Sequence, residues 1–165
     1  MAKFPEGATL DPFAIVRSDH QCFGCGEDNP IGLHLRFAAD GDSVRASFVP
    51  GPTHQGFGAI VHGGIISTVL DEAMAWATAR AGFWAMTGDM RVRFRQPLSV
   101  GESTVVSARV SGTRGRLVTT VGELVLESNR APVATATATF VKVDPELEAV
   151  WRARYLRESE TINEC

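Results

Sequence analysis

The chain has 165 residues, of which 44% are apolar and 21% are charged, and its formal net charge is −3. These values fit one soluble globular domain and leave little room for a second. The small negative charge excludes a general attraction to nucleic acid or to an anionic membrane. We expect neither as a partner, since no apolar run approaches the roughly 20 residues needed to cross a bilayer.

The start of the chain and its cysteines predict a cytoplasmic protein. The first residues hold no apolar stretch of the kind that a secretory signal needs. The cysteines, Cys22, Cys25 and Cys165, are odd in number and sparse, unlike the disulfide framework of a secreted protein.

The first third of the chain predicts an arm, a hairpin and a loop, in that order. Residues 1–30 are rich in Gly, Pro, Asp and Asn and predict an irregular arm with one short helix near 11–16. Apolar and polar residues alternate over 33–37 and 44–48, on either side of Gly41, which predicts a β-hairpin. Proline, glycine and histidine then break the chain into a loop.

One long helix is predicted over residues 65–81. Apolar side chains recur there every three or four positions, and Gly82 stands where a helix would stop. The opposite stripe carries small or polar groups, so the helix is apolar around most of its circumference. Such a helix is usually buried.

The second half of the chain is rich in β-branched residues and predicts four strands, over 85–95, 103–111, 117–126 and 131–143. A short charged helix and tail are expected over 144–165. One helix cannot cover both faces of a sheet this large, so we expect an antiparallel sheet curved around the helix and completed by a partner chain. This is the α+β hotdog fold, predicted here as a single domain with its core over 31–143.

The chemical signal is the sequence His62-Gly63-Gly64, followed after six residues by Asp71. Two glycines at the start of a buried helix let a substrate approach free backbone N–H groups at the positive end of the helix dipole. Those donors form a natural oxyanion hole. Asp71 lies among apolar neighbours, where a carboxylate is costly unless it is hydrogen-bonded or functional. The structural alternative is a helix start that needs glycine for packing and a satisfied buried carboxylate.

The length of the helix predicts a site shared between two chains. The nine residues from His62 to Asp71 span about 13 Å at about 1.5 Å per residue, too far for one acyl carbonyl to touch both ends. Two such helices running antiparallel across a two-fold axis bring Asp71 of one chain to Gly63 of the other. We therefore expect a homo-oligomer, either a dimer or a dimer of dimers.

The His-Gly-Gly motif and its aspartate, on the long helix of a multi-strand chain, resemble the hotdog acyl-CoA thioesterases of the phenylacetyl-CoA and THEM types. The segment Thr87-Gly-Asp-Met-Arg-Val-Arg-Phe-Arg-Gln-Pro97 resembles the strand after the helix in that family. The likeness covers roughly residues 30–143. It implies an acyl-CoA substrate, with coenzyme A as part of that substrate and no separate cofactor.

The resemblance implies a role for each residue of the motif. Asp71 would activate water, or attack the thioester directly to give an anhydride. The Gly63 N–H would polarise the thioester carbonyl. Gly64 would contact the substrate, and His62 would support the loop. Thr87 falls where the family places a hydroxyl that holds the attacking water.

The loop before the helix departs from the family pattern. Many relatives carry an Asn six residues before the histidine of the motif, where this chain has Gly56. Gln55 or His54 is then the candidate for the polar contact on the carbonyl side.

Arginines alternate along the strand after the helix. Arg91, Arg93 and Arg95 fall on one face of it, and Arg114 and Arg116 belong to the next hairpin. Arginine offers planar, bidentate donors for the phosphates of coenzyme A. The resemblance favours Arg93 and Arg95, because the family binds CoA along this strand. The alternative is an ordinary solvated sheet face.

Four residues near the start of the chain could be zinc ligands: His20, Cys22, Cys25 and His34. A C-x2-C pair supplies only two of the four ligands of structural zinc. The glycines and proline around the pair are typical of tight turns that lead into a strand. We therefore predict no metal site.

Two other functions stay open. A hydratase or dehydratase of acyl thioesters would pair His62 with an acid to move a proton at carbon, and a non-catalytic acyl-CoA-binding protein would bind without turnover. Within the thioesterase interpretation, Glu72 is a minor competitor of Asp71. Three aromatic residues either line an acyl tunnel or belong to the core: Trp76, Phe83 and Trp84.

Overall fold

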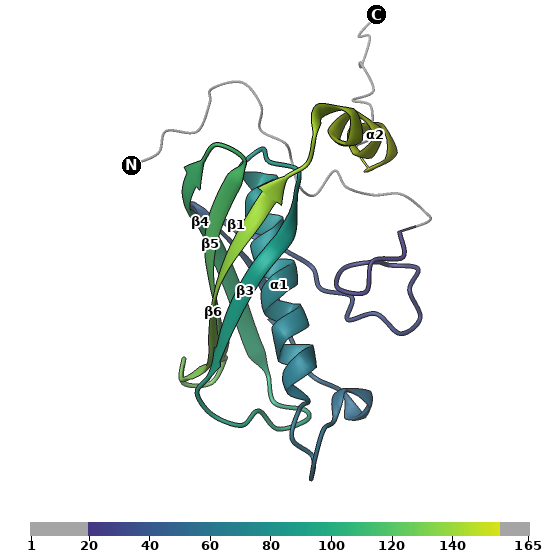
Figure 1. Cartoon of the computed structure of the whole chain (residues 1–165). Helices are drawn as coiled ribbons and strands as arrows, with labels where there is room; N and C mark the ends of the chain where they lie inside the picture. The colour runs from purple at the N-terminus through teal and green to yellow at the C-terminus, as the bar shows by residue number, and fades with distance from the viewer. Residues whose placement is uncertain (1–19, 156–165) are drawn as a thin grey trace, which may run out of the picture.

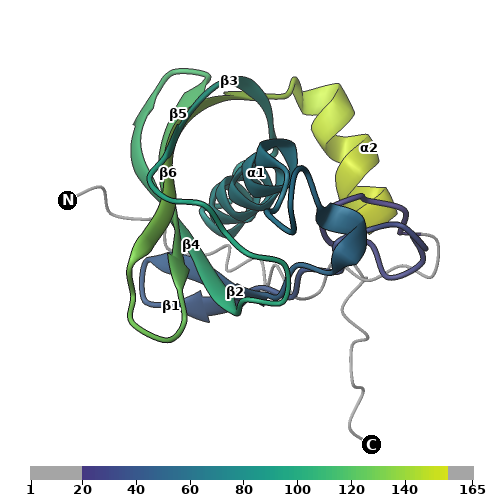
Figure 2. The same ribbon diagram turned by 90° about the horizontal axis from the view of Figure 1, so that it is seen from below.

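Six antiparallel strands form one sheet in the order β1-β2-β4-β5-β6-β3, in a computed structural model that describes residues 20–155. The strands are β1 (Ala38–Asp40), β2 (Ser43–Phe48), β3 (Ala85–Phe94), β4 (Thr104–Arg114), β5 (Leu117–Leu126) and β6 (Pro132–Lys142). The sheet curves around the helix α1 (Gly63–Arg80), as Figures 1 and 2 show. The helix α2 (Pro145–Tyr155) and the chain that precedes β1 lie on the side of α1 away from the sheet. The helix predicted near 11–16 and Cys165 lie outside the described residues.

The helix α1 begins and ends where the sequence predicts. His62 is its N-cap, and the His62 ring accepts a hydrogen bond of 2.9 Å from the Gly64 N–H. Gly82, with a positive φ of 83°, ends it, because an αL residue just after a helix lets the last carbonyls find partners. The face toward the sheet consists of Ile66, Val69, Leu70, Ala73, Met74, Ala77 and Thr78, all buried.

The four long strands of the second half are confirmed. Inward-facing side chains on each strand meet α1 in one apolar core, and Val106, Val118, Leu124 and Val133 are all fully buried there. Alternation with exposed positions follows the two-residue period of a strand. β4 runs three residues further than predicted, to Arg114, which lengthens its hairpin with β5.

The prediction of a strand over 33–37 is wrong. Leu35 and Phe37 are buried, as the alternation indicates, but the first strand begins only at Ala38. The N–H groups of Leu33 and Leu35 bond to the carbonyls of Phe23 and Gly24 instead of to a neighbouring strand. This segment therefore pairs with the preceding turn.

β3 is an edge strand, and it carries a bulge next to α1. Its only ladder is with β6, so its other edge has no strand partner among residues 20–155. The register shifts between Thr87 and Asp89, which leaves Gly88 as the extra residue. Bulges bend a strand and re-aim the side chains beside it, and they recur next to active sites.

The helix α2 packs on the outside of the fold. Asp144 caps its first turn by accepting from the N–H of Leu147 at 2.8 Å, and an ion pair of 2.7 Å joins Arg152 to Glu148. Trp151 on α2 meets Trp84 edge-on, with ring centroids 6.1 Å apart. Within the described residues, neither helix has the length and apolar character that crossing a membrane requires.

Candidate active site

Asp71 and Thr87 form the polar centre of the candidate active site. Asp71 is half-buried on the side of α1 that faces β3, and its Oδ1 accepts a hydrogen bond of 2.7 Å from the Thr87 hydroxyl. An ionised carboxylate only accepts hydrogen bonds, so the hydroxyl is the donor and its lone pairs stay available to a water. The structure thus brings together the predicted acid and the predicted water-holding residue.

The start of α1 offers a free backbone donor. His62 accepts from the Gly64 N–H, and its carbonyl accepts from the N–H groups of Ile65 and Ile66. The Gly63 N–H finds no acceptor among residues 20–155. It is the first N–H of the helix, one of the groups that a helix leaves unpaired at its positive end. It can therefore donate to an oxyanion.

Gly63 and Asp71 lie at opposite ends of β3. A Cβ added to Gly63 would lie 3.3 Å from the Phe94 ring, so the end of β3 packs on the start of α1. The start of β3 meets Asp71 through Thr87. Within one chain, Gly63 and Asp71 are eight residues apart on α1, about 12 Å along the axis. One chain alone does not place them around one carbonyl.

The loop before α1 is fixed by backbone contacts to its neighbours. The Gly56 N–H bonds to the Ile60 carbonyl at 2.7 Å, and the His62 N–H bonds to the His54 carbonyl at 2.8 Å. His54 ends the short 3-10 helix η2 (Pro52–His54), and its ring nitrogen Nδ1 accepts a hydrogen bond from the N–H of Gly51, the residue before this helix. That nitrogen is therefore already paired. Gln55 is exposed. Of the two predicted replacements for the family's Asn, Gln55 has the freer side chain.

The arginines in and just after β3 are exposed to solvent, whereas the two arginines of the β4–β5 hairpin differ in their contacts. Arg91, Arg93 and Arg95 are exposed, and none of the salt bridges within residues 20–155 involves them. Arg114 is exposed at the end of β4. Arg116 instead donates to the Lys142 carbonyl at 2.8 Å, which ties the hairpin to β6. Of the arginines predicted to bind phosphate, Arg93 and Arg95 are thus more available than Arg116.

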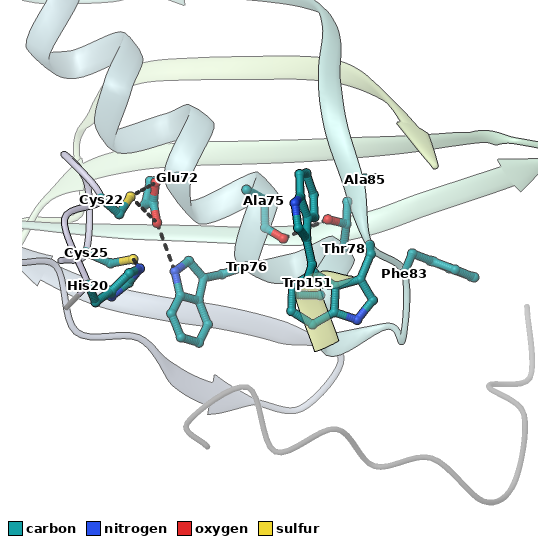
Figure 3. A pocket seen from close by; sticks show the side chains of 12 residues that line it. His20, Cys22, Cys25, Glu72, Ala75, Trp76, Thr78, Phe83, Ala85 and Trp151 are labelled. Carbon is teal, nitrogen blue, oxygen red and sulfur yellow. Dashed lines mark hydrogen bonds between the residues drawn. The ribbon is translucent and has the colours of Figure 1, made fainter. Parts of the chain in front are cut away.

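Glu72 lies on a different side of α1 from Asp71. Its carboxylate accepts from the Trp76 indole N–H at 3.0 Å and lies 3.5 Å from Cys22 Sγ (Figure 3). Burial raises the pKa of Glu72 to about 7, and the neighbouring Cys22 adds to the shift. A hydrogen bond with Cys25 lowers the pKa of the Cys22 thiol to about 5. Glu72 belongs to this thiol cluster and does not share the Asp71–Thr87 site.

The three aromatic residues singled out in the sequence line one cavity. Its volume is about 340 Å³, and Trp76, Phe83 and Trp84 are joined in its wall by Trp151 of α2 (Figure 3). His20, Cys22 and Cys25 line its other end. The sequence pointed to the three aromatic residues but not to the part of the wall that comes from α2 and the arm, because that part depends on where these segments fold back onto α1.

The central part of the chain is similar in sequence to known thioesterases. The sequence profile of the thioesterase superfamily matches residues 58–133, which include the glycine motif, Asp71 and β3. Acyl-coenzyme A thioesterase THEM4 of Bos taurus is 26% identical over 142 residues, which are 83% of this chain and 59% of that protein. The chain thus spans less than two thirds of the length of this curated relative.

Solved structures share the fold. Thioesterase superfamily member 2 of zebrafish superposes with a TM-score of 0.64 at 20% identity, over 70% of this chain and 89% of that one. A Streptococcus mutans protein bound to acetyl-CoA superposes with a TM-score of 0.62 at 16% identity, over 66% of this chain and 88% of that one. The predicted hotdog fold and the predicted resemblance to hotdog thioesterases are confirmed.

Proposed function

We propose that the chain is an acyl-CoA thioesterase whose active site is shared by two copies, because it has the hotdog fold and its residues 58–133 match the thioesterase superfamily. The observation that carries the proposal is the Asp71–Thr87 hydrogen bond beside an unpaired strand edge.

Asp71 is the catalytic carboxylate. With Oδ1 held by Thr87, its Oδ2 is left to accept a hydrogen bond from the attacking water, which the Thr87 oxygen would also bind. The carboxylate takes a proton from this water as the oxygen attacks the thioester carbonyl, and a positioned base of this kind accelerates a reaction by about 10²- to 10⁴-fold. Direct attack by Asp71 to give an anhydride is the alternative order of events, and Thr87 would orient the carboxylate in both.

Gly63 supplies the electrophilic half of the site. Attack on the carbonyl places negative charge on its oxygen, and the unpaired Gly63 N–H at the helix N-terminus is suited to donate a hydrogen bond to that oxygen. His62 holds the turn by capping α1, and Gly64 leaves room for the substrate. The Gln55 side chain is available for a further polar contact beside Gly56.

Pairing of the β3 strands of two chains would bring Asp71 of one chain to Gly63 of the other. A ten-residue edge strand with Met86 and Phe94 half exposed is a ready surface for a second copy. If two β3 strands pair antiparallel about an axis between Met90 and Arg91, Thr87 of one chain opposes Phe94 of the other. The Asp71–Thr87 pair then lies beside the start of α1 in the second chain, where Gly63 packs on Phe94.

Coenzyme A is the ligand that fits the exposed cations of β3. Arg93 and Arg95 lie at the Phe94 end of the strand, close to the proposed oxyanion donor, and guanidinium groups bind phosphates with two parallel hydrogen bonds. Arg114 adds a cation at the end of β4. The absence of a separate cofactor and the cytoplasmic location stay predictions.

The geometry of His62 gives less support to a hydratase than to a thioesterase. A hydratase would use His62 to move a proton, but the His62 Nδ1 already accepts from the Gly64 N–H as a helix cap. Release of free thiol from a panel of short, long and aromatic acyl-CoAs tests the proposal. Turnover with thiol release supports it. Hydration without thiol release, or tight binding without any product, would replace it with one of the other two functions.

A further inference from the structure

A cluster of metal-ligating side chains lies beside Glu72, on a different side of α1 from Asp71. The ligand atoms of His20, Cys22 and Cys25 all lie within 4.8 Å of one another, and His20 Nε2 is 3.9 Å from Cys25 Sγ. All three belong to the arm segment, defined here as residues 20–35, which folds against α1 (Figures 2 and 3). The sequence analysis predicted no metal because the C-x2-C pair supplies two ligands, and the structure adds a third.

Glu72 lies outside this three-residue cluster but is the candidate for a fourth ligand, because its carboxylate approaches Cys22. Its Oε2 lies 3.5 Å from Cys22 Sγ and its Oε1 lies 3.7 Å from the same atom. In a tetrahedral zinc site with Zn–S bonds of about 2.3 Å and Zn–O bonds of about 2.0 Å, neighbouring sulfur and oxygen ligands are about 3.5 Å apart. The Cys22–Glu72 contact thus has the length of one edge of such a site. Two sulfurs, one imidazole and one carboxylate form a donor set that zinc accepts.

The backbone of the arm is shaped to bring these ligands together. The Gly26 N–H closes a tight turn onto the Cys22 carbonyl at 2.9 Å. A Cβ on Gly26 would lie 2.4 Å from the His20 carbonyl, and a Cβ on Gly24 would lie 2.4 Å from the Glu72 carboxylate. A side chain at Gly26 would meet backbone and force the turn open, and a side chain at Gly24 would displace the Glu72 carboxylate. The two glycines therefore let the metal-binding side chains of the arm come close to Glu72 on α1.

Trp76 orients the carboxylate. Its indole N–H donates to Glu72 Oε1 at 3.0 Å, which leaves Oε2 directed at the thiols. Outer partners that hold a ligand through its second polar atom are a regular feature of metal sites. His34, the fourth residue considered from the sequence, stays outside the cluster, because its Nδ1 lies 2.9 Å from the Gly26 carbonyl.

We propose that His20, Cys22, Cys25 and Glu72 bind one Zn²⁺ per chain, as a structural site that fastens the arm segment to α1. Four protein ligands close the coordination sphere, so the ion holds the fold and does not activate water. The site joins the arm to the helix one residue beyond Asp71 and fixes one end of the aromatic cavity. The inference does not depend on the proposed thioesterase activity.

Metal content tests the proposal without an activity assay. The full chain, purified without a histidine tag and kept reduced, should contain about one zinc per chain by elemental analysis. After removal of zinc by a chelator, Co²⁺ should restore a stoichiometric complex with the thiolate charge-transfer absorption and the intense visible bands of tetrahedral cobalt. A chain that holds no zinc and takes up no Co²⁺ under these conditions would overturn the proposal, as would a Cys22–Cys25 disulfide in its place.

Variants assign the ligands. Cys22→Ser and Cys25→Ser should each abolish stoichiometric zinc and weaken the charge-transfer band, while the matched control His34→Asn, which suits the positive φ of 51° at that position, should keep both. Glu72→Gln keeps the size and the Trp76 partner but loses the charge, so it should change the cobalt spectrum and weaken binding. An unchanged spectrum in Glu72→Gln, or zinc retained by both serine variants, would contradict the ligand set.

Discussion

The Thr87 hydroxyl donates a hydrogen bond of 2.7 Å to Asp71 Oδ1 and so ties the edge strand β3 to the middle of α1. The bulge at Gly88 lies directly beside this contact. Because Thr87 belongs to β3, whose outer edge has no strand partner among the described residues, a second copy that pairs with that edge must approach the Asp71 carboxylate. The same contact therefore orients the acid and fixes its place relative to the proposed interface.

Replacing Asp71 by asparagine should remove most turnover. The amide keeps the size of the side chain and still accepts from Thr87, but it cannot take a proton from water. We expect kcat for thiol release from acyl-CoA to fall by about 10²- to 10⁴-fold. Asp42→Asn, in the exposed turn between β1 and β2, is the matched control and should keep wild-type kcat. Unchanged kcat in Asp71→Asn would exclude Asp71 as the catalytic group.

Removing the Thr87 hydroxyl should slow the reaction less severely. Thr87→Val keeps the β-branched shape of a strand residue and deletes only the donor to Asp71. A hydrogen bond to a charged group is worth about 1.5–3 kcal/mol, so we expect kcat to fall by about 10- to 150-fold. Thr113→Val, at an exposed position of β4, tests for a general effect of valine in the sheet. Equal rates for the two variants would leave Thr87 without a role.

The proposed oxyanion donor is a backbone N–H, and proline removes it. Proline is well suited to the first position of a helix, and His62 before it already has the extended backbone (φ −62°, ψ 133°) that a residue preceding proline prefers. Gly63→Pro should lower kcat by about 10²- to 10³-fold, as the loss of one oxyanion donor does elsewhere. Gly63→Ala adds the same Cβ near Phe94 but keeps the N–H, so it should retain most activity.

The β3 arginines should determine the affinity for the nucleotide half of the substrate. Arg93→Gln and Arg95→Gln should each raise KM for acyl-CoA by about tenfold and leave kcat nearly unchanged, because each removes a charge-assisted hydrogen bond to phosphate. A truncated thioester without the nucleotide phosphates should show no such difference between variant and wild type. Arg109→Gln, exposed on β4, is the control. Equal effects on both substrates would point to a structural role.

Local patterns were sufficient to predict most of the fold. The three- and four-residue spacing of apolar positions and the glycine after them located α1 to within two residues, since both signals act inside the helix itself. β-branched composition located the four long strands. The segment 33–37 was misassigned because alternation reports which side chains are buried, not which backbone partner they find.

Contacts between distant segments could not be read from the sequence. Glu72 and Cys22 are fifty positions apart, so nothing near either residue predicts that they meet. The bulge at Gly88 and the packing of Phe94 on Gly63 likewise depend on how β3 lies against β6 and α1. The spacing of the glycine motif and Asp71 could be read directly, because helix geometry alone sets the distance between them.

Subunit mixing tests the shared site most directly. A chain with Asp71→Ala and a chain with Gly63→Pro are each nearly inactive alone, but a mixed dimer holds one site with an intact Asp71 and an intact Gly63. Random reassortment of equal amounts should restore roughly a quarter of wild-type activity, since half of the dimers are mixed and each has one working site. A mixture no more active than its two components, with mixed dimers shown to form, would contradict the account.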